Sequence, residues 1–292
     1  MEILGSLTNI ETKIQKINGT VGVAAVDFKT GKSISLNHNE IFFTASVFKI
    51  PLLITLYKQV DTNSLDLEKR VTLSQEIKTG GSGVLRELMP GIQPSLLDLA
   101  MLMIIVSDNT ATDILYNIIG AKRINALMKD YNLPKTLTPM SCKQLLSSLV
   151  GIEPPKEATF KDIERIDGHY IPPKNCSALD ENKSNVSTPS EMVELMRLLA
   201  TGNILSTAST EDVLSILKSQ RLKTIIPHYL PKTTQIAHKT GGVYSVRCDV
   251  GIVWGSKGPY SIAIMAKNII DEPDIDNKLA ELSLLVYGQM TS

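Results

Sequence analysis

Apolar positions follow two different periods in this chain. Alternation of apolar and polar residues, typical of strands, is confined to the two ends, whereas the middle shows the helical spacing of three or four positions. Near the N-terminus, a helix is predicted at 4–17 and a hairpin of strands at 22–28 and 32–36. Further helices are predicted at 49–60, 96–106, 110–119, 122–131 and 190–199.

The C-terminal part returns to strands. They are predicted at 235–239, 247–254 and 260–267, and a helix at 274–287 follows them. Both ends combine helices with strands, and the middle is helical. The pattern therefore predicts an α+β fold, with one antiparallel sheet built from both ends and an all-helical lobe inserted between them.

Length and charge limit the kind of protein. The 292 residues are 43% hydrophobic, which is enough to bury a full core. Lys plus Arg and Asp plus Glu are both 30, so charge gives no argument for binding nucleic acid or an anionic membrane surface. No apolar stretch near the motifs described below reaches the roughly 20 residues of a membrane-spanning helix. We expect a monomer that acts on a small molecule.

The first fifteen residues bear on the compartment. They include acidic residues and lack a positively charged segment followed by an apolar one, so the sequence as it stands predicts a cytoplasmic protein. A periplasmic or secreted protein is the alternative if an export signal has been removed. The cysteines, Cys142, Cys176 and Cys248, are odd in number and form no C-x-x-C spacing, which favours a reducing compartment.

No metal or cofactor is expected. The histidines are scattered without a ligand spacing such as H-E-x-x-H, and a scattered histidine is usually structural. They are His38, His169, His228 and His238.

The first chemical candidate is the pair Ser46 and Lys49, at the start of the helix predicted over 49–60. A serine hydroxyl is a poor nucleophile unless a base lies next to it, and a desolvated lysine one helical turn away can serve as that base. Taken alone, S-x-x-K favours a simpler interpretation, in which the serine caps a helix and the lysine is solvated.

Two further motifs change this interpretation. Ser107-Asp108-Asn109 follows the apolar run 96–106, and Lys239-Thr240-Gly241 continues a predicted strand. In this order the three motifs resemble those of the class A β-lactamases and related penicillin-recognising serine enzymes. Ser107 follows Ser46 by 61 residues, close to the family's spacing, whereas Lys239 follows Ser107 by 132, which is longer than in the family. The surplus lies at about 140–187.

The resemblance implies a specific architecture. It is the β-lactamase/transpeptidase-like fold, in which an antiparallel sheet is flanked by terminal helices. Residues 1–45 together with 205–292 would form the sheet lobe. Residues 46–204 would form the helical lobe, with the insertion at about 140–187 as either a lid over the cleft or a disordered excursion.

The resemblance also assigns catalytic roles. Ser46 would be the nucleophile, and Lys49 its base or proton relay. Ser107 would pass the proton to the leaving nitrogen while its hydroxyl bridges Lys49 and Lys239. The N–H groups of Ser46 and Gly242 would form the oxyanion hole.

Binding roles follow in the same way. Asn109 would hold the side-chain amide of a substrate, and Lys239 and Thr240 its carboxylate. Gly241 would let the strand approach the acyl group closely. For Asp108, a cap for its own loop is favoured over a catalytic role, because aspartate commonly caps a following helix.

Arg247 is a possible second clamp for the substrate carboxylate. Many class A enzymes have an arginine nine residues beyond the strand lysine, whereas Arg247 is eight beyond Lys239 and Cys248 stands at the ninth position. A shift of one residue on a strand turns the side chain to the opposite face. A surface ion pair is therefore the favoured alternative for Arg247.

One family feature is missing. Class A β-lactamases carry a glutamate in an E-x-x-L-N setting, which activates the water that releases the acyl group. Counting back from Pro189, the corresponding segment is 170–176, which contains no carboxylate. The nearby acids, none of which precedes a Leu-Asn pair, are Glu153, Glu157, Glu164 and Glu181. Without this base we expect the acyl-enzyme to form and to hydrolyse slowly.

The sequence thus predicts a serine acyl-transfer hydrolase that forms a covalent intermediate at Ser46, with β-lactam hydrolysis as the leading activity. Two alternatives stay open. One is a D-alanyl-D-alanine peptidase, esterase or amidase that acts on peptide or ester substrates. The other is a non-catalytic penicillin-binding sensor that keeps the acylation pocket.

Overall fold

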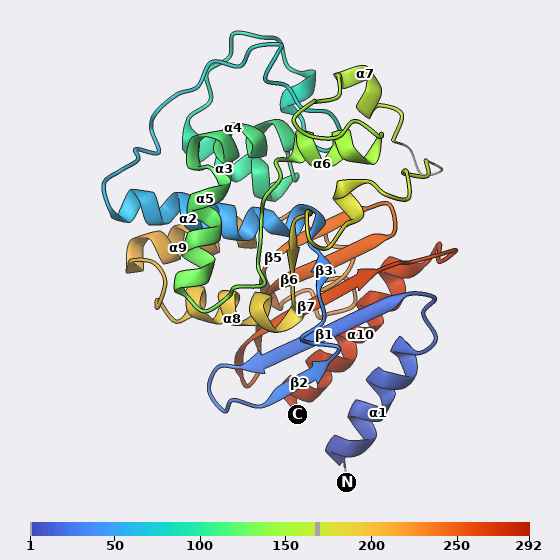
Figure 1. Cartoon of the computed structure of the whole chain (residues 1–292). Coiled ribbons are helices and arrows are strands. Elements are labelled where there is room, and N and C mark those ends of the chain that lie inside the picture. Colours follow the sequence, from blue (N-terminus) through green and yellow to red (C-terminus); the bar gives the residue numbers. More distant parts are fainter. Residues whose placement is uncertain (1, 167–169) are drawn as a thin grey trace. The chain divides into compact units, whose positions relative to one another are not determined.

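The computed structural model describes residues 2–166 and 170–292. They divide into two compact units (Figure 1). The sheet unit comprises the described part of Met1–Val47 together with Ser187–Asn203 and Leu222–Ser292, and the helical unit comprises that of Phe48–Val186 and Ile204–Arg221.

The sheet unit is built on five antiparallel strands in the order β2-β1-β7-β6-β5. Their bounds are β1 Thr20–Asp27, β2 Ser33–Leu36, β5 Gln235–Val243, β6 Val246–Gly255 and β7 Gly258–Lys267. The two-residue strands β3 (Phe42–Phe43) and β4 (Val186–Ser187) lie outside this sheet. Its helices are α1 Glu2–Ile14, α8 Pro189–Ala200 and α10 Ile275–Thr291.

The two faces of β1 pack against different helices. Val21 and Val23 belong to a buried apolar cluster with residues of α1 and α10, including Ile10 and Leu279. Gly22 points the other way, because a Cβ there would lie 2.8 Å from the ring of Pro189 in α8. The alternation of a strand therefore gives the sheet helices on both faces, as Figure 1 shows for α8 and α10.

The helical unit is arranged around α2, whose residues from Lys49 to Tyr57 are all buried. Helices α3, α4, α5 and α9 contact it. The bounds are α2 Lys49–Asp61, α3 Leu96–Ile105, α4 Asn109–Ile119, α5 Ala121–Asp130, α6 Cys142–Leu149, α7 Phe160–Ile163 and α9 Thr207–Lys218, with short 3₁₀ helices η2 Leu85–Glu87 and η3 Ser177–Leu179.

Side-chain caps fix where several helices begin. Ser95 and Asp98 form a capping box at α3, and Ser141 and Gln144 form another at α6. At α8 in the sheet unit, Thr188 accepts a hydrogen bond from the N–H of Glu191 and a proline occupies the first turn, which confirms the helix start predicted there.

The insertion has ordered structure where it is described. Its helices α6 and α7 share a small apolar cluster that includes Ala158 and Ile163. One carboxylate oxygen of Glu153 accepts hydrogen bonds from the Ser148 hydroxyl and the Ser177 N–H, at 2.8 and 3.1 Å, and so ties two insertion segments together. The prediction of a disordered excursion is therefore wrong for the described residues.

Helices α6, α7 and α9 had no counterpart in the sequence prediction, whereas the other helices and the strands of the main sheet were predicted within a few residues. Within the described part of the chain, no helix combines the length and the apolar character needed to cross a membrane.

Candidate active site

Ser46 lies in a short 3₁₀ helix, η1 (Ala45–Phe48), that leads directly into α2. The preceding Ala45 has a φ of 41°, a backbone conformation that side-chain-bearing residues rarely adopt. Such strain persists only where the surroundings enforce it, and it is concentrated at functional sites. Ser46 thus lies in a tight turn that ends where α2 begins, at Lys49.

Strand β5 approaches this turn at Gly241. A Cβ on Gly241 would lie 2.6 Å from the carbonyl oxygen of Thr44 and 3.0 Å from the backbone nitrogen of Ser46. No larger residue fits there without moving the backbone. Within the sheet unit, the glycine thus brings the strand against the amide of the candidate nucleophile.

Lys239 lies two residues before Gly241 on β5, and alternate residues of a strand share a face. It therefore projects on the side of the sheet that faces Ser46. Its side chain is 0% exposed, and its ammonium donates a hydrogen bond to the carbonyl of Thr240 at 2.6 Å. Thr240 is also buried.

Arg247 lies on β6, opposite Gly242. Its guanidinium pairs with Asp276 of α10 at 3.4 Å and donates to the carbonyls of Tyr244 and Val246 at 3.0 and 2.8 Å. This is the surface ion pair that the sequence favoured as the alternative to a carboxylate clamp.

In the helical unit, Lys49 is 0% exposed and makes three hydrogen bonds. Its ammonium donates to the carbonyl and the hydroxyl of Ser107 at 2.8 and 3.0 Å, and to Oδ1 of Asn109 at 2.9 Å. Burial lowers the pKa of Lys49, while Cys142, Asp113 and Asp108 act in the opposite direction. A buried lysine with a lowered pKa is the kind that can act as a base.

Ser107 links α3 to α4 and has a φ of 56°. Asp108 holds this link in place. One of its oxygens accepts the N–H of Ala111 at 2.9 Å as the cap of α4, and the other accepts those of Val84 and Leu85 at 2.7 and 2.8 Å. The prediction that Asp108 is a cap is confirmed.

Asn109 connects Lys49 to the glycine-rich segment 79–83. Its Oδ1 accepts from Lys49, and its Nδ2 donates to the carbonyl of Gly80 at 3.0 Å. A Cβ on Gly83 would lie 2.4 Å from Oδ2 of Asp108, and its φ is +114°. Only glycine suits that position.

The segment 170–176, which corresponds in sequence to the family's glutamate segment, contains Pro172 and Cys176 as its buried residues. Cys142, at the first position of α6, is buried and counteracts the lowering of the Lys49 pKa. Of the acids named from the sequence, Glu153 is used within the insertion, and Glu157 pairs with Lys143 at 3.2 Å.

Sequence reasoning also missed Asp113, an α4 residue that is 5% exposed. Its carboxylate accepts hydrogen bonds from the Thr79 hydroxyl at 2.8 Å and from the N–H groups of Cys142 and Lys143 at 2.7 and 2.9 Å. Burial raises the pKa of Asp113 to about 6, although these hydrogen bonds and Lys49 oppose the shift. The Ser141-x-x-Gln144 pattern could have located the helix start that this carboxylate binds.

No cluster of metal-ligating side chains occurs among the residues 2–166 and 170–292. His169 lies outside the described residues. His238 forms a buried pair with Asp249 at 2.8 Å between β5 and β6.

Within the helical unit, the structure thus brings together Lys49, Ser107 and Asn109. Within the sheet unit, it brings Gly241 against Ser46 by the approach of β5 to η1, with Lys239 on the same face of the strand as Gly241.

Comparison with known proteins gives consistent matches over nearly the whole chain. Residues 6–290 match the Beta-lactamase enzyme family. An imipenem-hydrolyzing beta-lactamase of Enterobacter cloacae is 26% identical over 98% of this chain and 89% of its own.

Solved structures agree in fold. A beta-lactamase of Sphaerobacter thermophilus superposes with a TM-score of 0.81 at 24% identity, over 98% of this chain and 97% of its own. A mutant of PBP-A, solved as an acyl-enzyme complex with penicillin G, superposes with a TM-score of 0.80 at 25% identity, over 98% and 96%. The β-lactamase/transpeptidase-like fold predicted from the motifs is confirmed.

Proposed function

Because the chain belongs to the Beta-lactamase enzyme family, we propose that it opens β-lactam rings through a covalent acyl-enzyme at Ser46. The observation that carries the proposal is the buried ammonium of Lys49, which is hydrogen-bonded to both Ser107 and Asn109 of the second motif. A solvated lysine after a capping serine, the simpler alternative, would not be fully buried.

Acylation begins at Ser46. Lys49 in its neutral form takes the proton of the Ser46 hydroxyl as the oxygen attacks the carbonyl carbon of the ring amide. Burial favours that neutral form because it lowers the pKa of Lys49. The oxyanion that forms is stabilised by the N–H groups of Ser46 and Gly242, and the close approach at Gly241 supports this arrangement.

The ring nitrogen then leaves with a proton from Ser107, whose hydroxyl is within 3.0 Å of the Lys49 ammonium. Lys239 and Thr240 bind the substrate carboxylate, and Asn109 holds the amide of the substrate side chain. Arg247 is left out of this set because Asp276 already pairs with it.

Deacylation needs a base that activates water. The segment 170–176, which corresponds to the family's glutamate-bearing segment, contains no carboxylate, and Glu153 and Glu157 have partners within the insertion. This observation favours a second candidate function, in which the acyl-enzyme persists and the protein is a penicillin-binding peptidase or sensor. A slow β-lactamase and a sensor differ only in the lifetime of the same intermediate.

Intact-mass spectrometry over time tests the proposal. The protein is mixed with benzylpenicillin, and the Ser46→Ala and Ser64→Ala variants are run in parallel. Ser64 is exposed and lies outside the site, so its variant is a matched control. We expect an adduct of one penicillin on the control and none on Ser46→Ala.

The course of the adduct separates the candidates. A transient adduct with product formation supports a working β-lactamase, and a persistent adduct supports the peptidase or sensor. An adduct that survives in Ser46→Ala would reject the proposed nucleophile. Mass measurement of the native assembly in the same sample tests the expectation of a monomer.

A further inference from the structure

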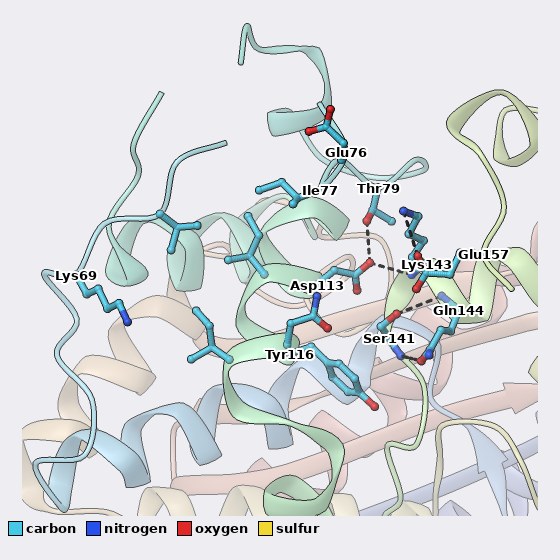
Figure 2. A pocket seen from close by; sticks show the side chains of 14 residues that line it. Lys69, Glu76, Ile77, Thr79, Asp113, Tyr116, Ser141, Lys143, Gln144 and Glu157 are labelled. Carbon is cyan, nitrogen blue, oxygen red and sulfur yellow. Dashed lines mark hydrogen bonds and ion pairs between the residues drawn. The ribbon is translucent and has the colours of Figure 1, made fainter. Parts of the chain in front are cut away.

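The helical unit contains a pocket of about 480 Å³ that the catalytic proposal does not use (Figure 2). Much of its wall is apolar and comes from α4 and from the segment before α3. Val71, Ile77, Ile114 and Ile118 contribute to that wall. A pocket of this volume is within the range that holds a small organic molecule.

The acid Asp113 stands among these apolar side chains. Figure 2 shows its carboxylate between Thr79 and Lys143, with dashed lines to both. Together with the Cys142 N–H it has three hydrogen-bond donors, whereas an ionised carboxylate offers about four acceptor positions. One acceptor position is thus left for a further donor.

The cations of the pocket do not neutralise Asp113. Lys143 gives it only a backbone N–H, while the ammonium of Lys143 pairs with Glu157 at 3.2 Å. In the described part of the chain, no lysine or arginine side chain is ion-paired with Asp113. The three acids that line the pocket, Asp113, Glu157 and Glu76, exceed its two lysines, Lys69 and Lys143, by one charge.

We propose that this pocket binds a small organic cation, a primary ammonium on an apolar body, with Asp113 as its ionic partner. The apolar body lies against Ile114 and Ile118, and the ammonium donates to the open position of the carboxylate. A neutral ligand of the same shape gains the apolar contacts and lacks the charge-assisted hydrogen bond.

Binding in this pocket is linked to Lys49. The negative charge of Asp113 raises the pKa of Lys49 and so counteracts the effect of burial. An ammonium bound to Asp113 offsets that charge, so the pKa of Lys49 falls further. A ligand in the pocket therefore favours the neutral form of Lys49. The relevance of this effect to catalysis rests on the proposed function, in which Lys49 is the base. Binding of the cation to the pocket does not depend on that function.

The test uses benzylammonium as the probe and benzyl alcohol as its neutral counterpart. Each is titrated into the isotope-labelled protein without any β-lactam, and the amide resonances of Cys142 and Lys143 are followed because these N–H groups donate to Asp113. We expect saturable shifts with benzylammonium and binding of benzyl alcohol that is about tenfold weaker or more.

Two matched variants test whether Asp113 supplies the negative charge that binds the ammonium. Asp113→Asn should weaken the binding of benzylammonium at least about tenfold, and Glu76→Gln, the same change at an exposed lining residue, should alter its affinity less than about twofold. Equal losses of affinity in both variants would mean that the ammonium is attracted by the overall negative charge of the pocket, and would overturn the proposal that Asp113 is its partner. Equal affinity for the alcohol, or shifts that do not saturate, would overturn it as well.

A third variant covers the case in which Asp113→Asn does not fold. Ile118→Trp fills the pocket from its apolar wall and leaves the hydrogen bonds of Asp113 in place. We expect it to abolish the saturable shifts. Unchanged binding in Ile118→Trp would place the cation elsewhere and reject the proposal.

Discussion

The motif residues of the sheet unit and those of the helical unit are held in place by different means. In the sheet unit, the approach of β5 to Ser46 depends on the absence of a side chain at Gly241 and on the backbone register of the strand. In the helical unit, Ser107 and Asn109 are held by polar side chains, above all by Asp108. The motif residues of the sheet unit are therefore sensitive to added side-chain atoms, whereas those of the helical unit are sensitive to the loss of hydrogen bonds.

Gly241→Ala should have the largest effect, because it disturbs the approach of β5 to Ser46 in the sheet unit. The new methyl group would meet the carbonyl of Thr44 at 2.6 Å and move β5 away from the amide of Ser46. Loss of oxyanion geometry typically lowers the rate by about a hundred- to a thousandfold. Stopped-flow acylation by a chromogenic cephalosporin measures this loss.

The control for that change is Gly288→Ala in α10, where a Cβ meets nothing within 4 Å. It should leave acylation unchanged and leave stability the same or slightly higher. A Gly241→Ala variant as fast as Gly288→Ala would show that the close approach of β5 does not matter for acylation.

Asp108→Ala should disturb the motif residues of the helical unit, because it removes hydrogen-bond acceptors and adds no atoms. It leaves the N–H groups of Val84, Leu85 and Ala111 without their partner, so we expect a loss of about 2–4 kcal/mol in the free energy of unfolding. Urea denaturation measures it.

Asp162→Ala removes the capping-box carboxylate of the short, more exposed helix α7 and serves as the comparison. Its expected loss is below about 1 kcal/mol. Similar losses for both variants would contradict the view that Asp108 organises the second motif.

The smallest expected effect concerns pH. Because burial raises the pKa of Asp113 to about 6, above the 3.8 of an unfolded aspartate, the folded state binds this proton more tightly. The stability that the proton contributes is fully present below about pH 4 and is lost as the pH rises through about 6.

Asp113→Asn should remove this dependence. Thermal unfolding of both proteins between pH 4 and 7.5 should show the wild type losing stability relative to the variant by a few degrees as the pH rises. Parallel curves over this range would mean that Asp113 titrates alike in the folded and unfolded chains.

Local pattern was enough for the strands of the main sheet and for most α-helices. The alternation in 22–28 and 32–36 and the apolar spacing of α2, α3 and α4 mark the period of each element in its own sequence. That β1 is covered on both faces and α2 is buried all round was not predicted. Helix α9 was missed because its first turn, rich in Thr and Ser, has weak intrinsic helix propensity. Its Ser206 cap was the available signal.

The site could be predicted only in part, because its electrostatics depend on distant partners. Asp113 looks like an ordinary helical residue until Thr79, 34 positions earlier, and Cys142, 29 positions later, are placed against it. Likewise, the motif identifies Lys49, but its burial follows from packing of the whole helical unit.

The pairing of β1 with β7 has a consequence for synthesis of the chain on the ribosome. Thr20 pairs with Lys267, so β1 is made long before its neighbour in the sheet exists. Most of the helical unit is contiguous from Phe48 to Val186 and can fold as it emerges. The N-terminal hairpin must stay unpaired on one edge until the last strands are made, and this makes it the segment most exposed to aggregation during translation.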